Sequence, residues 1–446
     1  MAQSPDTHYA TTADGVSIAY QTVGDGPVDL ALELENWGNV EIMWELEPLA
    51  DLLERLSSFS RLILHDRRGT GLSGGSSFPN LETRARDLLT VLDTIRSSRV
   101  ALVGERTTGA ALALFAATHP DRVSSLVWFK GVATRRWSPE YPWGDTPDDH
   151  RREAATVRDR MGSQEFGRGW LLWGAPSVAG VERLQAKVAR LDRHFMAPST
   201  AAEWIKVESE TDVTSVLPSL RCPTLVLDLE QSTTAAAESR HVRSRIPDAE
   251  LALISGDPDQ LPFGNRAEIV AAVREFVGRE RAVETSTSAL GSVLFTDIVG
   301  STERQASVGD RAWAELVGRH HAVVRDALER WRGVENDTAG DGFYATFDGP
   351  ARAIRCALDI ANRVRDMGIE IRAGVHTGEC EVIDGKHAGL AVVIGARIAA
   401  MAGPSEVLVS RTVKDLTAGS GFSFEGTGEH ELKGVPDRWH VYRVVA

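Results

Sequence analysis

The sequence of 446 residues lacks several features that would assign a protein to a class at once. It has three cysteines, Cys222, Cys356 and Cys380, and their odd number and wide spacing fit neither a disulfide framework nor a zinc cluster. No apolar run reaches the roughly 18 residues that a membrane-spanning helix needs. The polar N-terminal stretch does not resemble a secretory signal. We therefore expect a protein of the reducing cytoplasm without a membrane span.

Basic residues are too few for a surface that binds nucleic acid. The chain has 49 Lys and Arg against 63 Asp and Glu, which gives a net charge of -14 at pH 7. A nucleic-acid-binding surface requires a basic stripe, and the sequence shows none. We expect neither nucleic acid nor an anionic membrane as the main partner, whereas small anions such as nucleotides stay open. The length predicts two or three domains.

Strand-like and helix-like segments alternate from about residue 19 to residue 276. This pattern is typical of a doubly wound, mostly parallel α/β sheet, and we expect a first domain at 1–278. Helix-like sequence rich in tryptophan interrupts the alternation at about 135–217. A polar, Ser/Thr-rich stretch at 279–291 then has the composition of a linker.

The remainder, 292–446, mixes strands and helices without strict alternation, which predicts an α+β domain. The stretch LFTDIVGST (294–302) places Asp297 at the end of an apolar strand, before a helix start that can meet a phosphate. TAGDGFYATF (338–347) places Asp341 in a turn between two strands. Carboxylates at adjacent strand ends can hold Mg²⁺ or Mn²⁺, which prefer oxygen ligands and accompany phosphate substrates. Two unrelated turn aspartates would explain either motif alone.

Three further stretches follow in order: IRAGVHTGE (371–379), GLAVVIGARIAAMAGPSEVLVS (389–410) and ELKGVPDRWHVYRV (431–444). Together the five motifs resemble the class III adenylate/guanylate cyclase catalytic domain, and the resemblance covers residues 291–446. It implies a ferredoxin-like core and a head-to-tail homodimer with active sites at the interface. It also implies a phosphorus–oxygen lyase that converts ATP or GTP to the 3′,5′-cyclic nucleotide and pyrophosphate.

The resemblance carries roles for individual residues. Asp297 and Asp341 would bind two ions of Mg²⁺ or Mn²⁺ per active site, and Ile298 is placed with them among the metal-binding positions. Arg397, supplied by the partner protomer, would steady charge on the α-phosphoryl group. The implied phosphate-binding set is Val299, Gly300, Ser301 and Arg372, with Lys433 again from the partner.

Three positions depart from the family pattern. The residue that reads the purine, a lysine in adenylate cyclases, is Asp337, and its aspartate partner is Lys386. This charge-reversed pair can serve either purine with exchanged roles, or neither residue touches the base. The family asparagine falls on Val393, so one transition-state donor is missing. Such losses cost about 10²–10³ in rate, so we expect a slow cyclase.

The N-terminal part resembles α/β-hydrolases over about residues 8–278, with a helical cap at 135–217. Three stretches carry this resemblance: HDRRGTGLSG (65–74), VGERTTGAALALFAATHPDRVSSLVWF (103–129) and SGDPDQLPFGN (255–265). The nucleophile position in the strand-to-helix elbow is Arg106. The histidine position falls on Gln260 and the acid position near Ser232. None has the chemistry of a triad, so we expect a domain without hydrolase activity.

The sequence thus predicts a nucleotide cyclase fused behind a regulatory hydrolase-like domain, an order that resembles actinobacterial hydrolase–cyclase fusions. A degenerate cyclase that only binds nucleotide and a hydrolase with a relocated triad are the alternatives. The elbow presents a helix N-terminus beside Arg106, under a cap rich in tryptophan. This favours a pocket for a small-molecule anion. An ion pair of Arg106 with a nearby carboxylate is the competing explanation.

Overall fold

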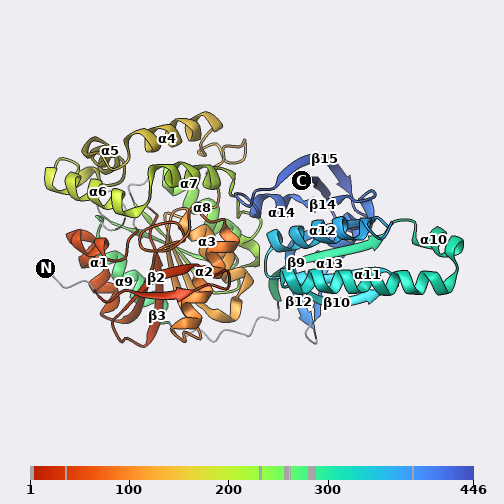
Figure 1. Cartoon of the computed structure of the whole chain (residues 1–446). Coiled ribbons are helices and arrows are strands. Elements are labelled where there is room, and N and C mark those ends of the chain that lie inside the picture. The colour runs from red at the N-terminus through yellow and green to blue at the C-terminus, as the bar shows by residue number, and fades with distance from the viewer. Residues whose placement is uncertain are drawn as a thin grey trace. The chain divides into compact units, whose positions relative to one another are not determined.

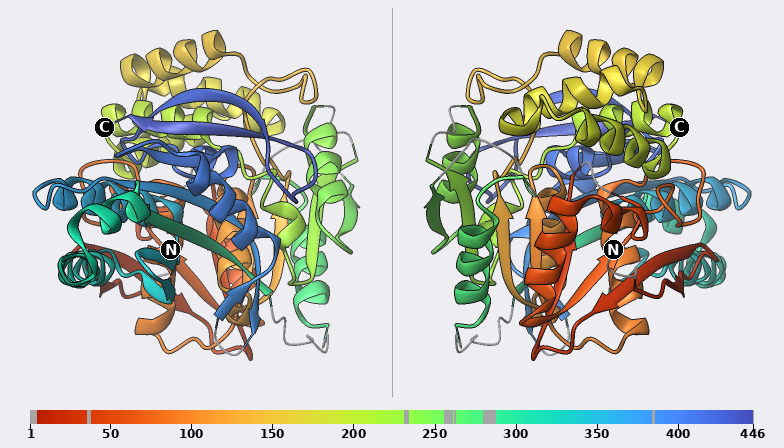
Figure 2. Two further views of the ribbon diagram at one scale, coloured as in Figure 1. Left: turned by 90° about the vertical axis from the view of Figure 1, so that its right-hand side faces the viewer. Right: turned by 90° about the vertical axis from the view of Figure 1, so that its left-hand side faces the viewer.

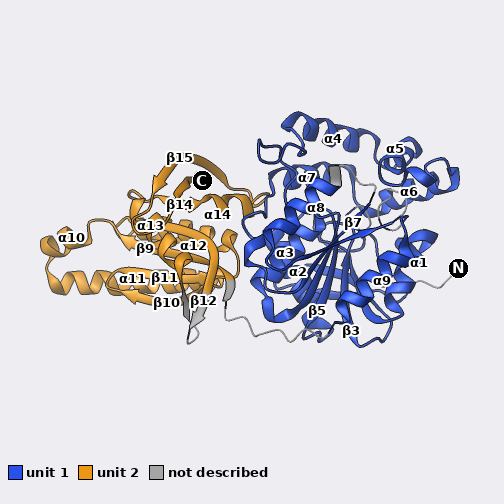
Figure 3. Cartoon of the chain, turned by 180° about the vertical axis from the view of Figure 1, so that it is seen from behind, with its two compact units in different colours: residues 1–286 blue, residues 287–446 orange. Residues whose placement is uncertain are grey.

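The chain forms two compact units in a computed structural model, residues 1–286 and 287–446 (Figure 3). The structure describes residues 5–35, 38–230, 234–255, 261, 263–279, 288–383 and 386–445. The positions Ser232 and Gln260 lie outside the described residues. Strand β9 (Ser288–Ile298) begins within the stretch expected to be a linker, because residues 288–291 pair with 378–381 of the following domain.

The first unit is built on one eight-stranded sheet with the order β1-β2-β4-β3-β5-β6-β7-β8 (Figure 1). All neighbours from β4 to β8 run parallel, whereas β1 and β2 are antiparallel additions at the edge. Central strands such as β5 and β7 are buried along their whole length, as expected for apolar strands covered on both faces. The strands are β1 (His8–Thr11), β2 (Ser17–Val23), β3 (Val28–Glu33), β4 (Ser60–His65), β5 (Val100–Glu105), β6 (Val123–Phe129), β7 (Thr224–Leu229) and β8 (Glu250–Ile254).

Helices flank this sheet, with α1 and α9 on one side of the strands and α2 and α3 on the other (Figure 1). They are α1 (Glu47–Ser57), α2 (Leu81–Thr94), α3 (Thr108–Thr118), α8 (Thr234–Arg245) and α9 (Arg266–Val277). Asn80 begins α2, since its side chain accepts a hydrogen bond from the Thr83 N–H. The predicted doubly wound α/β architecture is confirmed.

Four helices between β6 and β7 form the cap and gather on one side of the unit (Figure 2). They are α4 (Pro147–Arg160), α5 (Gln164–Gly174), α6 (Glu182–Phe195) and α7 (Pro198–Glu210). Thr146 and Asp149 start α4 with a reciprocal capping box. An apolar cluster that includes Phe195 and Trp204 joins the cap helices.

The second unit has a β-α-β-β-α-β core whose strands lie in the order β10-β11-β9-β12, each pair antiparallel. This is the ferredoxin-like arrangement, as predicted. β14 adds parallel to β12, and β16 and β15 complete the sheet. The strands after β9 are β10 (Val334–Ala339), β11 (Gly342–Phe347), β12 (Ile371–Ile383), β13 (Lys386–Ala388), β14 (Val407–Ser410), β15 (Ser423–Glu431) and β16 (Arg438–Val445).

Helices α11 and α12 pack on the sheet through one apolar cluster, and α13 packs on it separately. A methyl group on Gly374 of β12 would overlap the backbone of Ala399 in α13, so glycine permits their close approach. The helices are α10 (Ser301–Val308), α11 (Asp310–Trp331), α12 (Pro350–Arg365), α13 (Leu390–Met401) and α14 (Arg411–Leu416).

Candidate active site

Asp297 lies near the end of the central strand β9, directly opposite Arg372 of β12. The Nη2 and Nε atoms of Arg372 lie 2.5 and 3.1 Å from Oδ2 of Asp297. This pair is partly exposed, with 38% and 36% of the two side chains accessible. The Arg372 guanidinium therefore contacts the Asp297 carboxylate at a place that solvent can reach.

Asp341 sits in the turn between β10 and β11, beside the end of β9. Its Oδ2 accepts a hydrogen bond of 3.0 Å from the Ile298 N–H. Burial and the negative charge of Asp297 raise the pKa of Asp341. The structure therefore brings the two predicted carboxylates together.

Two neighbouring histidines on α11 hold this turn, and sequence analysis did not identify them. The Nε2 atoms of His320 and His321 lie 3.2 and 3.0 Å from the carbonyl oxygens of Asp341 and Gly340. Burial lowers the pKa of His320 to about 4, so this ring is neutral at pH 7 and donates through Nε2–H. Two adjacent histidines were the signal that the sequence offered. The carbonyl groups that they contact lie on a separate segment, which the sequence alone does not indicate.

The loop after β9 leads into α10 through Gly300, whose φ of 67° is left-handed. The first N–H groups of a helix have no partner within it, which leaves the backbone of Gly300 and Ser301 at an anion-binding helix start. The predicted contribution of Val299 differs, because its N–H donates to the Glu370 carbonyl at 2.9 Å. The Ile298 N–H is likewise engaged by Asp341.

A cavity of about 440 Å³ opens at this edge of the sheet. Asp297, Asp337 and Arg372 line it with polar groups, and Phe295 and Tyr344 line it with aromatic rings. The two rings stack with centroids 4.7 Å apart and an interplanar angle of 3°. Helix α13 closes the other wall with small side chains. The cavity thus combines carboxylates, one cation and a flat aromatic surface.

Arg397 and Lys433 come together, since Nε of Arg397 donates to the Lys433 carbonyl at 3.0 Å. Both residues are exposed, as is Val393, 40% of which is accessible. Val393 and Arg397 share one face of α13 and are absent from the lining of the cavity, whereas Val392 and Ala396 contribute to it. α13 therefore presents one face to this cavity and another to solvent.

The two predicted purine-reading positions are not adjacent in the sheet. Asp337 pairs with Tyr344, whose neighbours across β9 and β12 are Phe295 and Gly374. The backbone of Lys386 pairs with Ile383 at the far end of β12. Asp337 lines the cavity.

The elbow of the first unit is present, with Arg106 at its tip between β5 and α3. Arg106 has a φ of 49°, an unusual value for a residue other than glycine. Its N–H donates to the Phe129 carbonyl at 2.9 Å, and its own carbonyl accepts from Trp128 Nε1 at 2.6 Å. The fold thus keeps the strained backbone of a nucleophile elbow and presents a guanidinium there.

Carboxylates surround this guanidinium. Arg106 Nε lies 3.1 Å from Glu35 Oε2, and Nη1 lies 3.6 Å from Glu238 Oε2. Two acidic side chains already pair the charge of Arg106, which supports the competing explanation of an ion pair over an anion bound at Arg106. The sequence did not indicate these partners. Glu35 lies between β3 and α1 and Glu238 lies in α8, and these segments, distant in the chain, meet only in the fold.

A shared proton lies next to Arg106. The hydroxyl oxygen of Thr107 is 2.7 Å from a carboxyl oxygen of Glu35 and 2.7 Å from one of Glu208. A hydroxyl has one proton to donate, so one of the two carboxyls must be protonated and donate to it. Burial and the charge of Glu35 raise the pKa of Glu208, which favours the protonated form of this carboxyl. Burial also raises the pKa of Glu105 to about 8.

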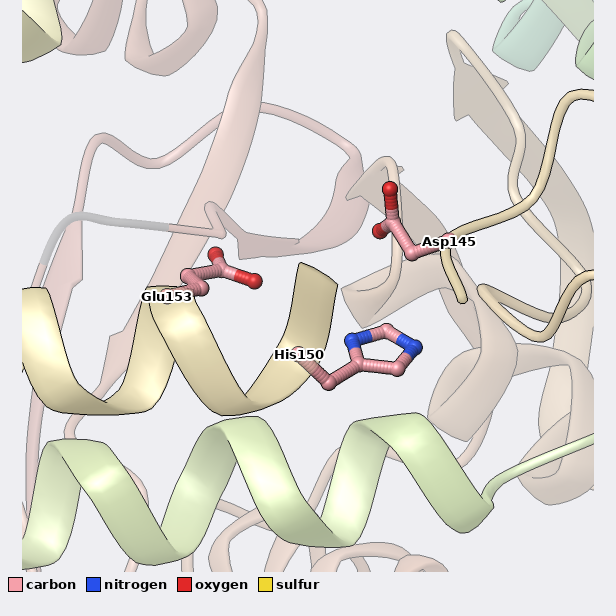
Figure 4. A group of neighbouring side chains, drawn as sticks. All are labelled: Asp145, His150 and Glu153. Carbon is pink, nitrogen blue, oxygen red and sulfur yellow. The ribbon is translucent and has the colours of Figure 1, made fainter. Parts of the chain in front are cut away.

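Among the described residues, one group of three potential metal ligands lies close together: Asp145, His150 and Glu153, at the start of α4 (Figure 4). Arg135 already neutralises both carboxylates, with Nη2 2.8 Å from Asp145 Oδ2 and 2.5 Å from Glu153 Oε2. A metal ion there would face the half-buried guanidinium of Arg135. We therefore interpret this group as the anchor of Arg135.

Comparison with known proteins matches the two units to different kinds of protein. Residues 283–446 match the family model of the adenylate and guanylate cyclase catalytic domain. The uncharacterized protein R02095 of Rhizobium meliloti is 28% identical over 38% of this chain, but the match spans only 18% of that protein. The uncharacterized protein Rv2212 of Mycobacterium tuberculosis is 23% identical over 59% of this chain and 71% of its own length.

The first unit has solved structural neighbours. The bromoperoxidase from Bacillus anthracis superimposes with a TM-score of 0.52 at 22% identity, covering 61% of this chain and 100% of that chain. This likeness shows the α/β-hydrolase fold. Within the described part of the chain, no helix combines the length and apolarity that crossing a membrane demands.

Proposed function

Residues 283–446 belong to the adenylate and guanylate cyclase catalytic domain family, and from this premise we propose that the chain converts ATP or GTP to the 3′,5′-cyclic nucleotide and pyrophosphate. The observation that carries the proposal is the convergence of Asp297 and Asp341 at one edge of the sheet, beside Arg372 and a cavity of about 440 Å³. A protein that had lost this chemistry would have no evident use for two such carboxylates.

The donor set fits a hard divalent cation. Asp297 and Asp341 offer carboxylate oxygens, which Mg²⁺ and Mn²⁺ prefer, and burial together with the negative charge of Asp297 raises the pKa of Asp341. When bound, the metal would lower the barrier by activating the ribose hydroxyl and neutralising the triphosphate. Arg372 now compensates Asp297. On this proposal Arg372 turns to the nucleotide phosphates once a cation takes its place.

The chain's own residues position the nucleotide. The free N–H groups at the start of α10 face where β- and γ-phosphates are expected. Arg397 and Lys433 lie together on a surface directed away from the cavity of their own chain. We propose that they complete the site of a second copy, in which Arg397 steadies the charge that develops on the α-phosphoryl group.

An exposed apolar stripe on α13 supports this homodimer. Leu390, Val393 and Met401 are 48%, 40% and 36% accessible and share the helix face of Arg397. Such a row at helical spacing favours contact with another surface. We propose that the first unit, which presents Arg106 in place of a nucleophile, regulates this dimer through a ligand rather than hydrolysing one.

The test is a turnover assay on the full chain with Mn²⁺ or Mg²⁺ and either ATP or GTP, measuring cyclic product and pyrophosphate together. The Asp297→Asn variant should lose activity, whereas Asp348→Asn, at an exposed acid of the same unit, should keep it. Nucleotide binding is measured in parallel by equilibrium dialysis. Binding without product would identify a nucleotide-binding module, and the absence of both would overturn the proposal. Hydrolysis of a chromogenic ester would instead favour a relocated triad.

A further inference from the structure

A cavity of about 280 Å³ lies in the first unit between the cap helices and the elbow. Its walls are largely aromatic: Phe166, Trp170 and Trp173 come from α5, Phe195 from α6 and Trp204 from α7. Trp173 is 57% accessible and lies at the outer end of this wall. A pocket of this composition suits an apolar molecule with a few polar groups.

The cavity is lined by more acidic side chains than basic ones. Arg106 is paired with Glu35 at 3.1 Å, and Arg135 is paired with Glu153 at 2.5 Å. Each of these cations is thereby neutralised by an acid that also lines the cavity. The fifth ionisable residue of the lining, Asp192 of α6, stands outside both pairs.

Asp192 forms no ion pair with any of the described residues. Its side chain is buried, with 6% of the residue accessible, and among the described residues Oδ2 has no hydrogen-bond partner. Burial raises the pKa of Asp192 to about 7, opposed only by the charge of Arg193. An unpaired buried acid is unfavourable and is retained here on the wall of an aromatic cavity.

We propose that this cavity binds an organic ammonium ion, with its cationic nitrogen against Asp192 and its apolar body among the tryptophan and phenylalanine rings. This inference rests on the proposal that the first unit binds a ligand, and it names the class of that ligand. Aromatic faces attract ammonium groups, and a carboxylate supplies the opposite charge. An anionic ligand would find both arginines engaged and would meet an additional acid.

Binding is tested on the full chain without nucleotide, so that the outcome is independent of cyclase activity. The probes are 2-phenylethylammonium, its neutral isostere 2-phenylethanol and the anion phenylacetate, followed by tryptophan fluorescence and calorimetry. The ammonium should bind about tenfold or more tightly than the alcohol, as expected for one charge-assisted contact, and phenylacetate should not bind measurably.

Variants assign the site. Asp192→Asn should weaken ammonium binding about tenfold while leaving the alcohol unchanged, and Asp159→Asn on the exposed face of α4 should alter neither. Trp173→Ala removes an accessible ring and should also weaken ammonium binding, which provides a second variant at the site. Equal affinity of wild type and Asp192→Asn, tighter binding of phenylacetate, or no binding of any probe would each overturn the proposal.

Discussion

Replacing Asp192 by Asn should stabilise the first unit, and more strongly as the pH rises. Burial raises the pKa of Asp192 from its ordinary value of 3.8 to about 7. The folded state therefore keeps a proton that the unfolded state has released between these two values. The carboxyl thus lowers the free energy of unfolding progressively as the pH rises from about 4 to about 7, with no further change above.

The magnitude follows from the difference in pKa. About 3 units correspond to about 4 kcal/mol at high pH, since one unit is about 1.4 kcal/mol. At about pH 5 the folded carboxyl is still protonated, and more than half of this cost is absent. The asparagine side chain has the same shape and no charge. Its advantage over the wild type should therefore shrink by about 3 kcal/mol between about pH 8.5 and about pH 5.

Urea denaturation of the full chain at both pH values, followed by tryptophan fluorescence, measures this difference. Both proteins keep the ion pairs of Glu35 with Arg106 and of Glu153 with Arg135. The contributions of these pairs to the difference in unfolding free energy therefore cancel. Asp159→Asn, at an exposed carboxylate, serves as the control and should give no such change. A stability difference that is the same at both pH values would refute the assignment of a neutral buried acid.

Three further predictions concern the second unit. Val393→Asn should restore the missing donor and raise kcat about tenfold or more, whereas Val393→Ala should not; steady-state kinetics compares them. Arg397→Ala and Asp297→Asn should each be inactive, but mixing the two proteins should recover activity, because one site of each mixed dimer would be intact; no recovery would argue against a shared site. Gly374→Ala should displace α13 and reduce cyclase activity while the unfolding transition of the first unit stays unchanged, as two melting curves would show.

The local sequence pattern was enough to predict helices and strands that are long and strongly periodic. Strands β3 to β8 and helices α2 and α9 alternate over the range of about 19–276 in which the sequence predicts such an alternation. The edge strand β1 lies before this range, because it is short and has no clear apolar run. The pair Asp297 and Asp341 was predictable, since each residue sits in a motif that ends or begins a strand.

The environment of Arg106 was not predictable in the same way. Glu35, Glu208 and Glu238 belong to distant segments and read in the sequence as ordinary surface acids, yet all three are buried. Their meeting depends on how the cap and the strand ends converge, which periodicity does not encode. Tertiary convergence also explains the ion pairs of Arg106, which sequence analysis offered only as the competing explanation.

The carboxylates around Arg106 bear on how such a domain changes over evolutionary time. Restoring a serine at the elbow tip would remove the guanidinium and leave Glu35 and Glu238 without their shared counter-charge. Uncompensated buried charge is strongly destabilising, so a reversion at this one position would be selected against even if hydrolysis were useful. The residue at the elbow tip is in this sense fixed by neighbours that pair with its charge, whatever the pocket binds.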